Sequence, residues 1–152
     1  MTAFQVQKRK ESQQHKDRYF LDIAQMVATR ATCPRRKVGC VLVDSKQHIV
    51  ATGYNGVPSG FKHCVDSPCP GAEYDTGQGL DACEAIHAAV NAFLQLRSDD
   101  ALTAYLTVMP CFSCAKMIAN SSVERIVAAE TYAHTQSVHM LEKAGIGIKV
   151  ME

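Results

Sequence analysis

Hydrophobic and polar positions follow helical spacing in some stretches of the chain and strand spacing in others. Apolar side chains at positions 20, 23, 24, 27 and 28 recur at helical spacing, which predicts a first helix. Residues 37–44 are typical of a buried strand, and residues 48–54 read as its antiparallel neighbour. Residues 55–80 hold five of the nine glycines and three of the five prolines, which predicts a long loop of the kind that usually carries function.

The second half of the chain alternates between helix and strand. Such alternation implies a parallel portion of a sheet with helices packed on its faces, so the predicted class is α/β. We expect one domain over residues 1–152. The polar, mildly basic residues 1–16 are expected to form a frayed or solvated helix start, with a nucleic-acid arm as the alternative. The predicted helices are 86–97, 111–120 and 135–144, and the predicted strands are 104–109, 125–130 and 146–151.

Composition narrows the possible partners and the compartment. A chain of 152 residues with 47% hydrophobic residues can bury a core. A net charge of +1 gives no strong electrostatic field that would indicate binding to nucleic acid or to a membrane surface. No apolar run approaches the roughly 18 residues of a membrane span, and the N-terminus is too polar for a secretory signal. Seven cysteines, an odd number, favour a reducing cytoplasm over a disulfide framework.

His87, Cys111 and Cys114 have the spacing of a catalytic zinc site. Such a site has three protein ligands and leaves the fourth position to water, whose pKa the metal lowers. Cysteines three apart at a helix start can hold one ion, and Pro110 is tolerated there. A redox Cys-x-x-Cys would leave His87 unused, and a closed structural site would need a fourth ligand that the sequence does not supply.

Position 89 carries alanine where hydrolytic zinc chemistry of this type needs a carboxylate. The pattern His-x-Glu followed by Pro-Cys-x-x-Cys uses its glutamate to move protons, and Ala89 cannot do so. Glu84 precedes His87 by three residues and is not expected to substitute. Two interpretations remain: a natural pseudoenzyme, or a Glu→Ala replacement that traps substrate, which the otherwise intact motif favours. Residues two apart on a helix point in different directions, so residues 87 and 89 can share a pocket only in the first turn of a helix. That helix should therefore start near Ile86 with its N-terminus facing the zinc.

Five stretches form a distinctive series along the chain: CPRRKVG from Cys33, GYNGVPSG from Gly53, His63-Cys64, CEAIHAAVN from Cys83 and PCFSCAKMI from Pro110. These stretches resemble, in the same order, those of the deoxycytidylate (dCMP) deaminases of bacteria and phages. The resemblance extends over about residues 18–148. It implies a three-layer, cytidine-deaminase-like fold with a five-stranded mixed sheet flanked by helices. It also implies conversion of dCMP to dUMP, homohexamers, activation by dCTP and inhibition by dTTP with Mg²⁺.

The resemblance suggests roles for substrate-binding residues. Asn55 is similar to an asparagine that holds the sugar, although an Asn-Gly turn explains it equally well. Tyr132 resembles a tyrosine near the substrate, with a core or edge aromatic as the alternative. The backbone of His87, Ala88 and Cys111 would meet the polar edge of the base. A monophosphate needs a cation or a helix start, and the candidates are Arg30, Thr32, Arg35, Arg36 and Lys37.

Two further sites are candidates. Cys33, His63, Cys64 and Cys69 could hold a second, structural zinc, or they could be loop residues of a regulatory site. Cys40 is expected in the core, and Cys83 is ambiguous. The effector triphosphate is assigned to the glycine-rich loop, where backbone amides can approach phosphate. That loop contributes Gly53, Tyr54, Asn55, Gly56, Pro58 and Gly60.

Three functional classes remain. The first is a dCMP deaminase disabled at position 89, and the second is a non-catalytic nucleotide sensor. The third is a polynucleotide-editing deaminase of the tRNA type. Such an enzyme would favour a basic surface that meets phosphates. This chain has a net charge of +1 and no basic cluster near the site, which argues against that class.

Overall fold

A computed structural model describes residues 1–75, 78–79, 82–131 and 135–152 of the chain. A five-stranded sheet has the order β2-β1-β3-β4-β5. β1 pairs antiparallel with both β2 and β3, whereas β3, β4 and β5 run parallel, so the sheet is mixed as predicted. The strands are β1 (Gly39–Val43), β2 (Ile49–Tyr54), β3 (Thr103–Leu106), β4 (Arg125–Ala128) and β5 (Gly147–Val150).

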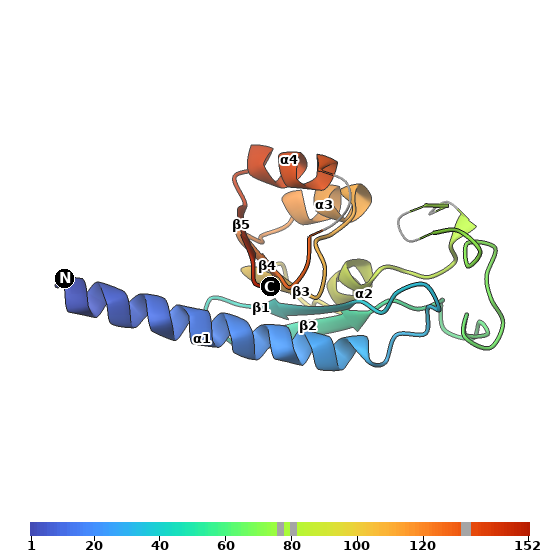
Figure 1. The fold of residues 1–152 in the computed structure, drawn as a ribbon, viewed down its shortest axis with the longest axis horizontal. Helices are drawn as coiled ribbons and strands as arrows, with labels where there is room; N and C mark the ends of the chain where they lie inside the picture. The colour runs from blue at the N-terminus through green and yellow to red at the C-terminus, as the bar shows by residue number, and fades with distance from the viewer. Residues whose placement is uncertain (76–77, 80–81, 132–134) are drawn as a thin grey trace.

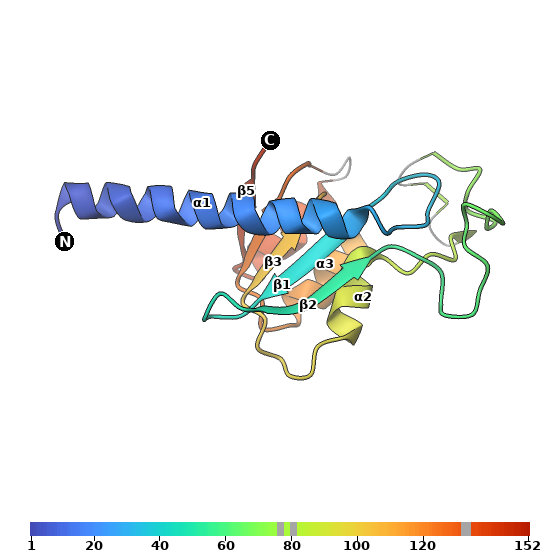
Figure 2. The ribbon, with the colours of Figure 1, turned by 90° about the horizontal axis from the view of Figure 1, so that it is seen from below.

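Helices cover both faces of this sheet, giving three layers (Figures 1 and 2). One helix lies along one face, and the other three lie on the opposite face. Three of the four differ from the predicted helices by only a few residues at their ends, whereas the first begins well before its predicted apolar positions. The four helices are α1 (Ala3–Ala28), α2 (Ala88–Leu94), α3 (Phe112–Ala119) and α4 (Gln136–Lys143).

The two cores follow from side-chain alternation along β1. Val41 and Val43 face α1, where they pack with Phe20, Leu21 and Tyr105. The remaining β1 side chains point to the other face, into the core shared with α2, α3 and α4. All five β1 residues are buried, because a central strand between two helical layers has no solvent face.

The first helix extends further toward the N-terminus than its apolar periodicity. Residues 1–16 are helical from Ala3 onward, with a capping box between Thr2 and Gln5, and their side chains are almost all exposed. The structure therefore extends the first helix from its predicted apolar positions back to Ala3.

Strand β3 is shorter than the predicted 104–109, for a reason that bears on function. It ends at Leu106, and Val108, Met109 and Pro110 then leave the sheet and line a cavity. The apolar run continues because these residues face a pocket rather than a neighbouring strand.

Candidate functional site

Two helices begin at the residues expected to hold metal. His87 is the N-cap of α2 and Cys111 is the N-cap of α3, and both have extended backbone conformations. Neither side chain caps its own helix, so both are available for other contacts. The α2 start is two residues beyond the expected Ile86, and the expectation that the helix mouth faces the cysteine pair is met.

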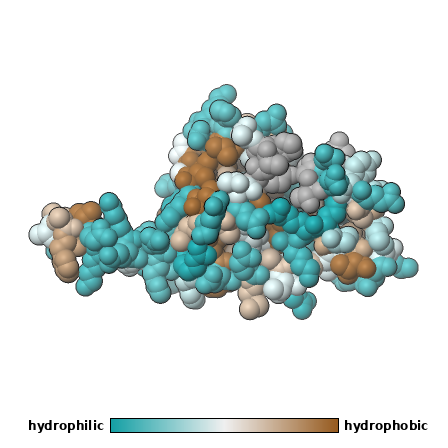
Figure 3. Space-filling view, viewed as in Figure 1, coloured by the Kyte–Doolittle hydropathy of each residue, from teal (hydrophilic) through white to brown (hydrophobic). Residues whose placement is uncertain are grey.

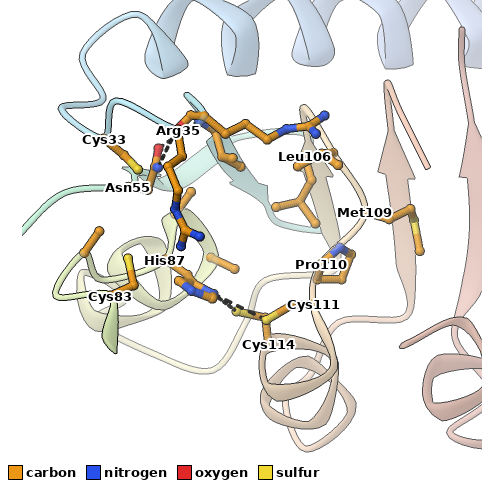
Figure 4. Close-up of a pocket in the computed structure, with 16 residues that line it drawn as sticks. Cys33, Arg35, Asn55, Cys83, His87, Leu106, Met109, Pro110, Cys111 and Cys114 are labelled. Atoms are coloured by element: carbon orange, nitrogen blue, oxygen red, sulfur yellow. Dashed lines mark hydrogen bonds between the residues drawn. The ribbon is translucent and has the colours of Figure 1, made fainter. Parts of the chain in front are cut away.

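His87, Cys111 and Cys114 converge on one point (Figure 4). The Nδ1 atom of His87 lies 3.3 Å from the Sγ of Cys111 and 3.4 Å from the Sγ of Cys114. Tetrahedral zinc with ordinary Zn–N and Zn–S bonds would hold such atoms about 3.5 Å apart. Among the described residues, this is the one group of three or more ligating side chains whose donor atoms all lie within 4.8 Å of one another. The donor set and its spacing fit a single zinc ion.

The protonation chemistry of the trio suits a cation. The hydrogen bond from Cys114, supported by that to His87, lowers the pKa of the Cys111 thiol. The same bond and burial raise the pKa of Cys114, and the bond to Cys111 raises the pKa of His87. A bound cation would displace the remaining thiol proton as both cysteines become thiolates.

The trio lies in the wall of a cavity of about 110 Å³ (Figure 4). Four segments build this cavity: the loop after α1, Asn55 at the end of β2, the residues that lead into α2, and the passage from β3 into α3. Leu106, Val108 and Met109 supply apolar walls, as does Val38. Such a lining suits a flat ring whose polar edge meets a few fixed groups.

Ala89 lies in this cavity, in the first turn of α2, and is 3% exposed. Among the described residues that line the cavity, none has an acidic side chain. Glu84 is exposed and does not line it. The position expected to carry a proton-transferring carboxylate therefore faces the metal ligands, and it holds a methyl group.

Asn55 lines the cavity and also organises its rim. Its Oδ1 accepts from the backbone N–H of Val38 at 2.8 Å, and its Nδ2 donates to the carbonyl of Arg36 at 2.7 Å. These bonds fix the loop that carries the two arginines of the cavity. They account for an asparagine at this position, and the side chain can still meet a ligand.

Of the cationic candidates for a phosphate, Arg35 and Arg36 line the cavity. Arg35 donates to the carbonyls of Tyr74, Asp75 and Gln78 at 3.3, 3.0 and 2.5 Å, which ties a distant loop to the rim. Arg36 forms an ion pair with Glu130.

The other candidates lie elsewhere. Arg30 is exposed in the turn after α1, Lys37 is exposed, and neither lines the cavity. Thr32 is half-buried, and its buried Oγ1 has no hydrogen-bond partner among the described residues. Tyr132 lies outside the residues that the structure describes.

A second group of thiols borders the same cavity. Cys64 is hydrogen-bonded to Cys69, Cys69 to Cys83, and Cys33 lies close enough to Cys64 to influence its charge. Burial opposes ionisation of Cys69, yet backbone N–H groups of Glu84 and Gly71 lower its pKa.

The structure thus brings together three of the four residues predicted for a second metal. His63 is exposed, and Cys83 joins the group instead. The sequence left Cys83 ambiguous because nothing local distinguishes it.

Packing explains one glycine of the glycine-rich loop, and pairing with a distant segment fixes another part of that loop. A Cβ at Gly53 would overlap the backbone of Ala88 and Ala92, so glycine lets β2 approach α2. Gly56 pairs with Ile86 through two backbone hydrogen bonds, of 3.2 and 2.8 Å. Tyr54 and Gly60 are exposed, and the loop connects β2 to the start of α2.

Similar proteins are deoxycytidylate deaminases. The enzyme of that name from Mycobacterium phage D29 is 40% identical over 119 residues, covering 73% of this chain and 91% of the phage protein. The Saccharomyces cerevisiae deoxycytidylate deaminase is 32% identical over 137 residues; 88% of this chain matches, but it spans only 44% of the yeast protein. The dCMP deaminase of cyanophage S-TIM5, solved with dCMP and dUMP, superposes with a TM-score of 0.69 at 25% identity, covering 88% of this chain and 95% of that one.

A family model describes the same region of the chain. Residues 14–130 match the cytidine and deoxycytidylate deaminase zinc-binding region. This span includes His87, Cys111 and Cys114, together with the loop that carries Asn55. The chain therefore belongs to the cytidine and deoxycytidylate deaminase family, whose three-layer fold it shares.

Proposed function

We propose that this chain has the site of a zinc-dependent hydrolase that converts dCMP to dUMP. The observation that carries the proposal is the convergence of His87, Cys111 and Cys114 in the wall of an apolar cavity, in a chain of the deaminase family. Zinc held by these three residues would supply Lewis acidity that lowers the pKa of water. The dCMP and dUMP bound by the cyanophage relative support this choice of nucleotide.

The chain's own residues then bind and orient the nucleotide. The apolar walls take the pyrimidine ring and exclude bulk water. The backbone of His87, Ala88 and Cys111 meets its polar edge, and Asn55 meets the sugar. Arg35, with its guanidinium on the cavity side of the rim (Figure 4), is the cation best placed for the phosphate. Arg30 and Thr32, which do not line the cavity, stay candidates for contact with the phosphate from outside it. Tyr132 remains a candidate substrate contact.

Ala89 makes this chain a binding-competent but catalytically impaired form. A carboxylate at this position would take a proton from water and deliver it to the ring nitrogen and the leaving ammonia. The methyl group of Ala89 leaves those transfers without a carrier, so dCMP should bind and persist. We favour a Glu→Ala replacement in a working deaminase over a natural nucleotide sensor, because the rest of the site is intact.

Ala89→Glu tests the function directly. Zinc-loaded Ala89→Glu should release ammonia from dCMP roughly 10²–10⁴-fold faster than the present chain, as expected for one general acid–base group. Ala89→Gln is the matched control, because it has the same size and cannot carry the proton. If Ala89→Glu binds zinc and stays inert on dCMP, dCTP and cytidine, the nucleotide-sensor interpretation replaces this one.

The second thiol group is proposed as a structural zinc site formed by Cys33, Cys64, Cys69 and Cys83. Four sulfurs would make a closed site, but they would first have to be drawn together, because no three of them lie within 4.8 Å of one another in the structure. The backbone N–H groups that lower the pKa of Cys69 also suit a bound thiolate. Such an ion would order the described residues of 61–84, which contain no α-helix or strand.

Regulation and assembly complete the proposal. We retain a homohexamer, activated by dCTP and inhibited by dTTP with Mg²⁺, with the effector near residues 53–60. Exposed Tyr54 and the open surface at Gly60 leave room there. The cytoplasm, or a host's cytoplasm for a phage protein, suits seven cysteines that are all free thiols in the structure. Among the described residues, no helix is both long and apolar enough to cross a bilayer.

A further inference from the structure

The first four turns of α1 form an arm that projects from the body. We define the arm as residues 1–16; all its side chains are exposed except that of Gln13, which is half-buried. The first buried residue of α1 is Asp17, and Figures 1 and 2 show the helix continuing past the sheet without a neighbour. Most helical stability in proteins comes from tertiary packing, so this unpacked segment would gain stability from a partner.

The arm combines basic charge with an apolar tip. Lys8, Arg9, Lys10 and Lys16 are opposed by the single acid Glu11. At the tip, Met1 is 75% exposed and Phe4 is 76% exposed. Large apolar side chains held in water at the end of a projecting helix indicate a contact surface rather than a solvated extension.

The complementary surface lies at the other end of the molecule. We call the described residues of 61–84 (61–75, 78–79 and 82–84) the acidic loop. They lie at the far end from the arm in both ribbon views, and apolar residues are visible at both ends in Figure 3. Lys62 is the one lysine or arginine of this stretch. Its exposed acidic residues are Asp66, Glu73, Asp75 and Glu84, and its exposed large apolar residues are Phe61, Val65 and Tyr74.

We propose that the arm of one copy of this chain docks on the acidic loop of a second copy. The arm is part of a continuous helix that points away from its own loop, so it cannot fold back onto it. Basic side chains would meet carboxylates, while Met1 and Phe4 would pack against Phe61, Val65 or Tyr74. Each copy carries both the arm and the acidic loop. Two copies that bind each other reciprocally form a dimer, and copies that bind head to tail form a closed ring.

This contact would also touch the cavity. Arg35 donates to the carbonyls of Tyr74, Asp75 and Gln78, which belong to the acidic loop. An arm docked on these residues would restrain the loop that holds Arg35 at the rim. The interface does not depend on the deaminase chemistry, and it specifies a contact for the oligomer proposed above.

Charge reversal tests the contact in the full chain. The arm variant is Lys8→Glu, Arg9→Glu and Lys10→Glu together; the loop variant is Asp66→Lys, Glu73→Lys and Asp75→Lys. Sedimentation equilibrium at low salt should show self-association that each variant weakens by roughly tenfold or more and that added salt also weakens. Combining the six changes should restore association, because the charges match again. A control with Lys46→Glu, Arg97→Glu and Lys143→Glu, all exposed elsewhere, should associate normally.

Three outcomes would overturn the contact. One is a chain that stays monomeric at about 100 μM and low salt, a concentration at which even micromolar affinity would be evident. Another is an oligomer that ignores both reversals, which would leave the hexamer standing on a different interface. The third is a monomer whose arm binds a short DNA duplex, since the arm would then serve nucleic acid. None of these readouts depends on deaminase activity, so the two proposals can fail separately.

Discussion

At the scale of single residues, the type of a residue and the groups around it together determine its pKa and whether it can bind a metal. Cys40, Cys64 and Cys111 are all buried thiols, yet burial raises the pKa of Cys40 to about 12 while hydrogen bonds lower that of Cys111. Only the cysteines that have sulfur or imidazole neighbours can form metal sites. The structure thus sorts seven cysteines into a trio site, a four-thiol group and one core residue.

Metal analysis of cysteine variants checks this assignment. Cys111→Ser and Cys114→Ser should each lose one zinc per chain, because two remaining ligands hold the ion poorly. Cys64→Ser and Cys83→Ser should each lose a different, second zinc. Cys40→Ala and His63→Ala are the controls and should keep the full zinc content, measured by plasma mass spectrometry. Loss of zinc in His63→Ala with retention in Cys83→Ser would return the second site to its sequence-based ligand set.

At the scale of elements, close backbone approach positions α2. Gly53 of β2 lies against the backbone of Ala88 and Ala92, which places the start of α2, and with it His87, at the cavity. Gly53, which its sequence context assigned to the effector triphosphate, therefore has a packing role as well.

Gly53→Ala should destabilise the fold and disturb the metal trio. The added methyl group must push α2 away from the sheet, at a cost of about 1–3 kcal/mol, as for other overpacked cores. Thermal unfolding and zinc affinity should both fall. Gly147→Ala in β5 is the matched control, because the nearest atom to its added Cβ is 3.8 Å away. Equal melting temperatures for the two variants would contradict this account.

A buried carboxylate fastens α1 to the sheet. Asp17 is fully buried and accepts hydrogen bonds from Arg125 and, at 2.9 Å, from the hydroxyl of Tyr105; Lys149 lies 3.3 Å away. Burial opposes its charge, but the hydrogen bonds, with that of Arg125 the strongest, lower the pKa of Asp17 below its ordinary 3.8.

Asp17→Asn should cost about 3 kcal/mol at neutral pH, since it leaves Arg125 without its buried partner. A carboxyl whose pKa is lower in the folded than in the unfolded state stabilises the fold above the unfolded value. That contribution declines as the pH falls below about 3.8 and through the folded pKa. Urea unfolding of both proteins from pH 7 to pH 3 should therefore show the difference shrinking only in the acidic range. A difference independent of pH would show that Asp17 acts through shape alone.

At the scale of the whole molecule, the acidic loop links the cavity, the thiol group and the proposed interface. Cys64, Cys69 and Cys83 hold the loop from within, and Arg35 holds it from the rim. A ligand or partner that orders this loop would therefore alter the cavity without touching the zinc ligands.

Effector binding should be visible as a change in stability. In the presence of Mg²⁺, dCTP and dTTP should each raise the melting temperature, because a ligand bound only by the folded state stabilises it by mass action. dCMP binding, followed by calorimetry, should strengthen with dCTP and weaken with dTTP. ATP at the same concentration serves as the control triphosphate. Identical dCMP affinity with and without both effectors would remove the regulatory proposal.

The spacing of residues along the chain was enough to predict much of the secondary structure and the candidate zinc ligands. The period of apolar residues predicted the α/β class and the described helices and strands to within a few residues, except for the start of α1. His87, Cys111 and Cys114 were identifiable because ligand spacing and helix starts are local properties. Ala89 was likewise interpretable from its distance to His87.

Tertiary structure decided the features that depend on residues far apart in the chain. Only folding could show that Cys83 is hydrogen-bonded to Cys69 while His63 is exposed, that Arg35 rather than Arg30 lines the cavity, or that Asp17 meets Arg125 across 108 positions. Only folding could place a basic arm and an acidic loop at opposite ends of one molecule. Periodicity carries the geometry of the backbone over a few turns, whereas these contacts depend on how the layers pack and on where each loop crosses the sheet.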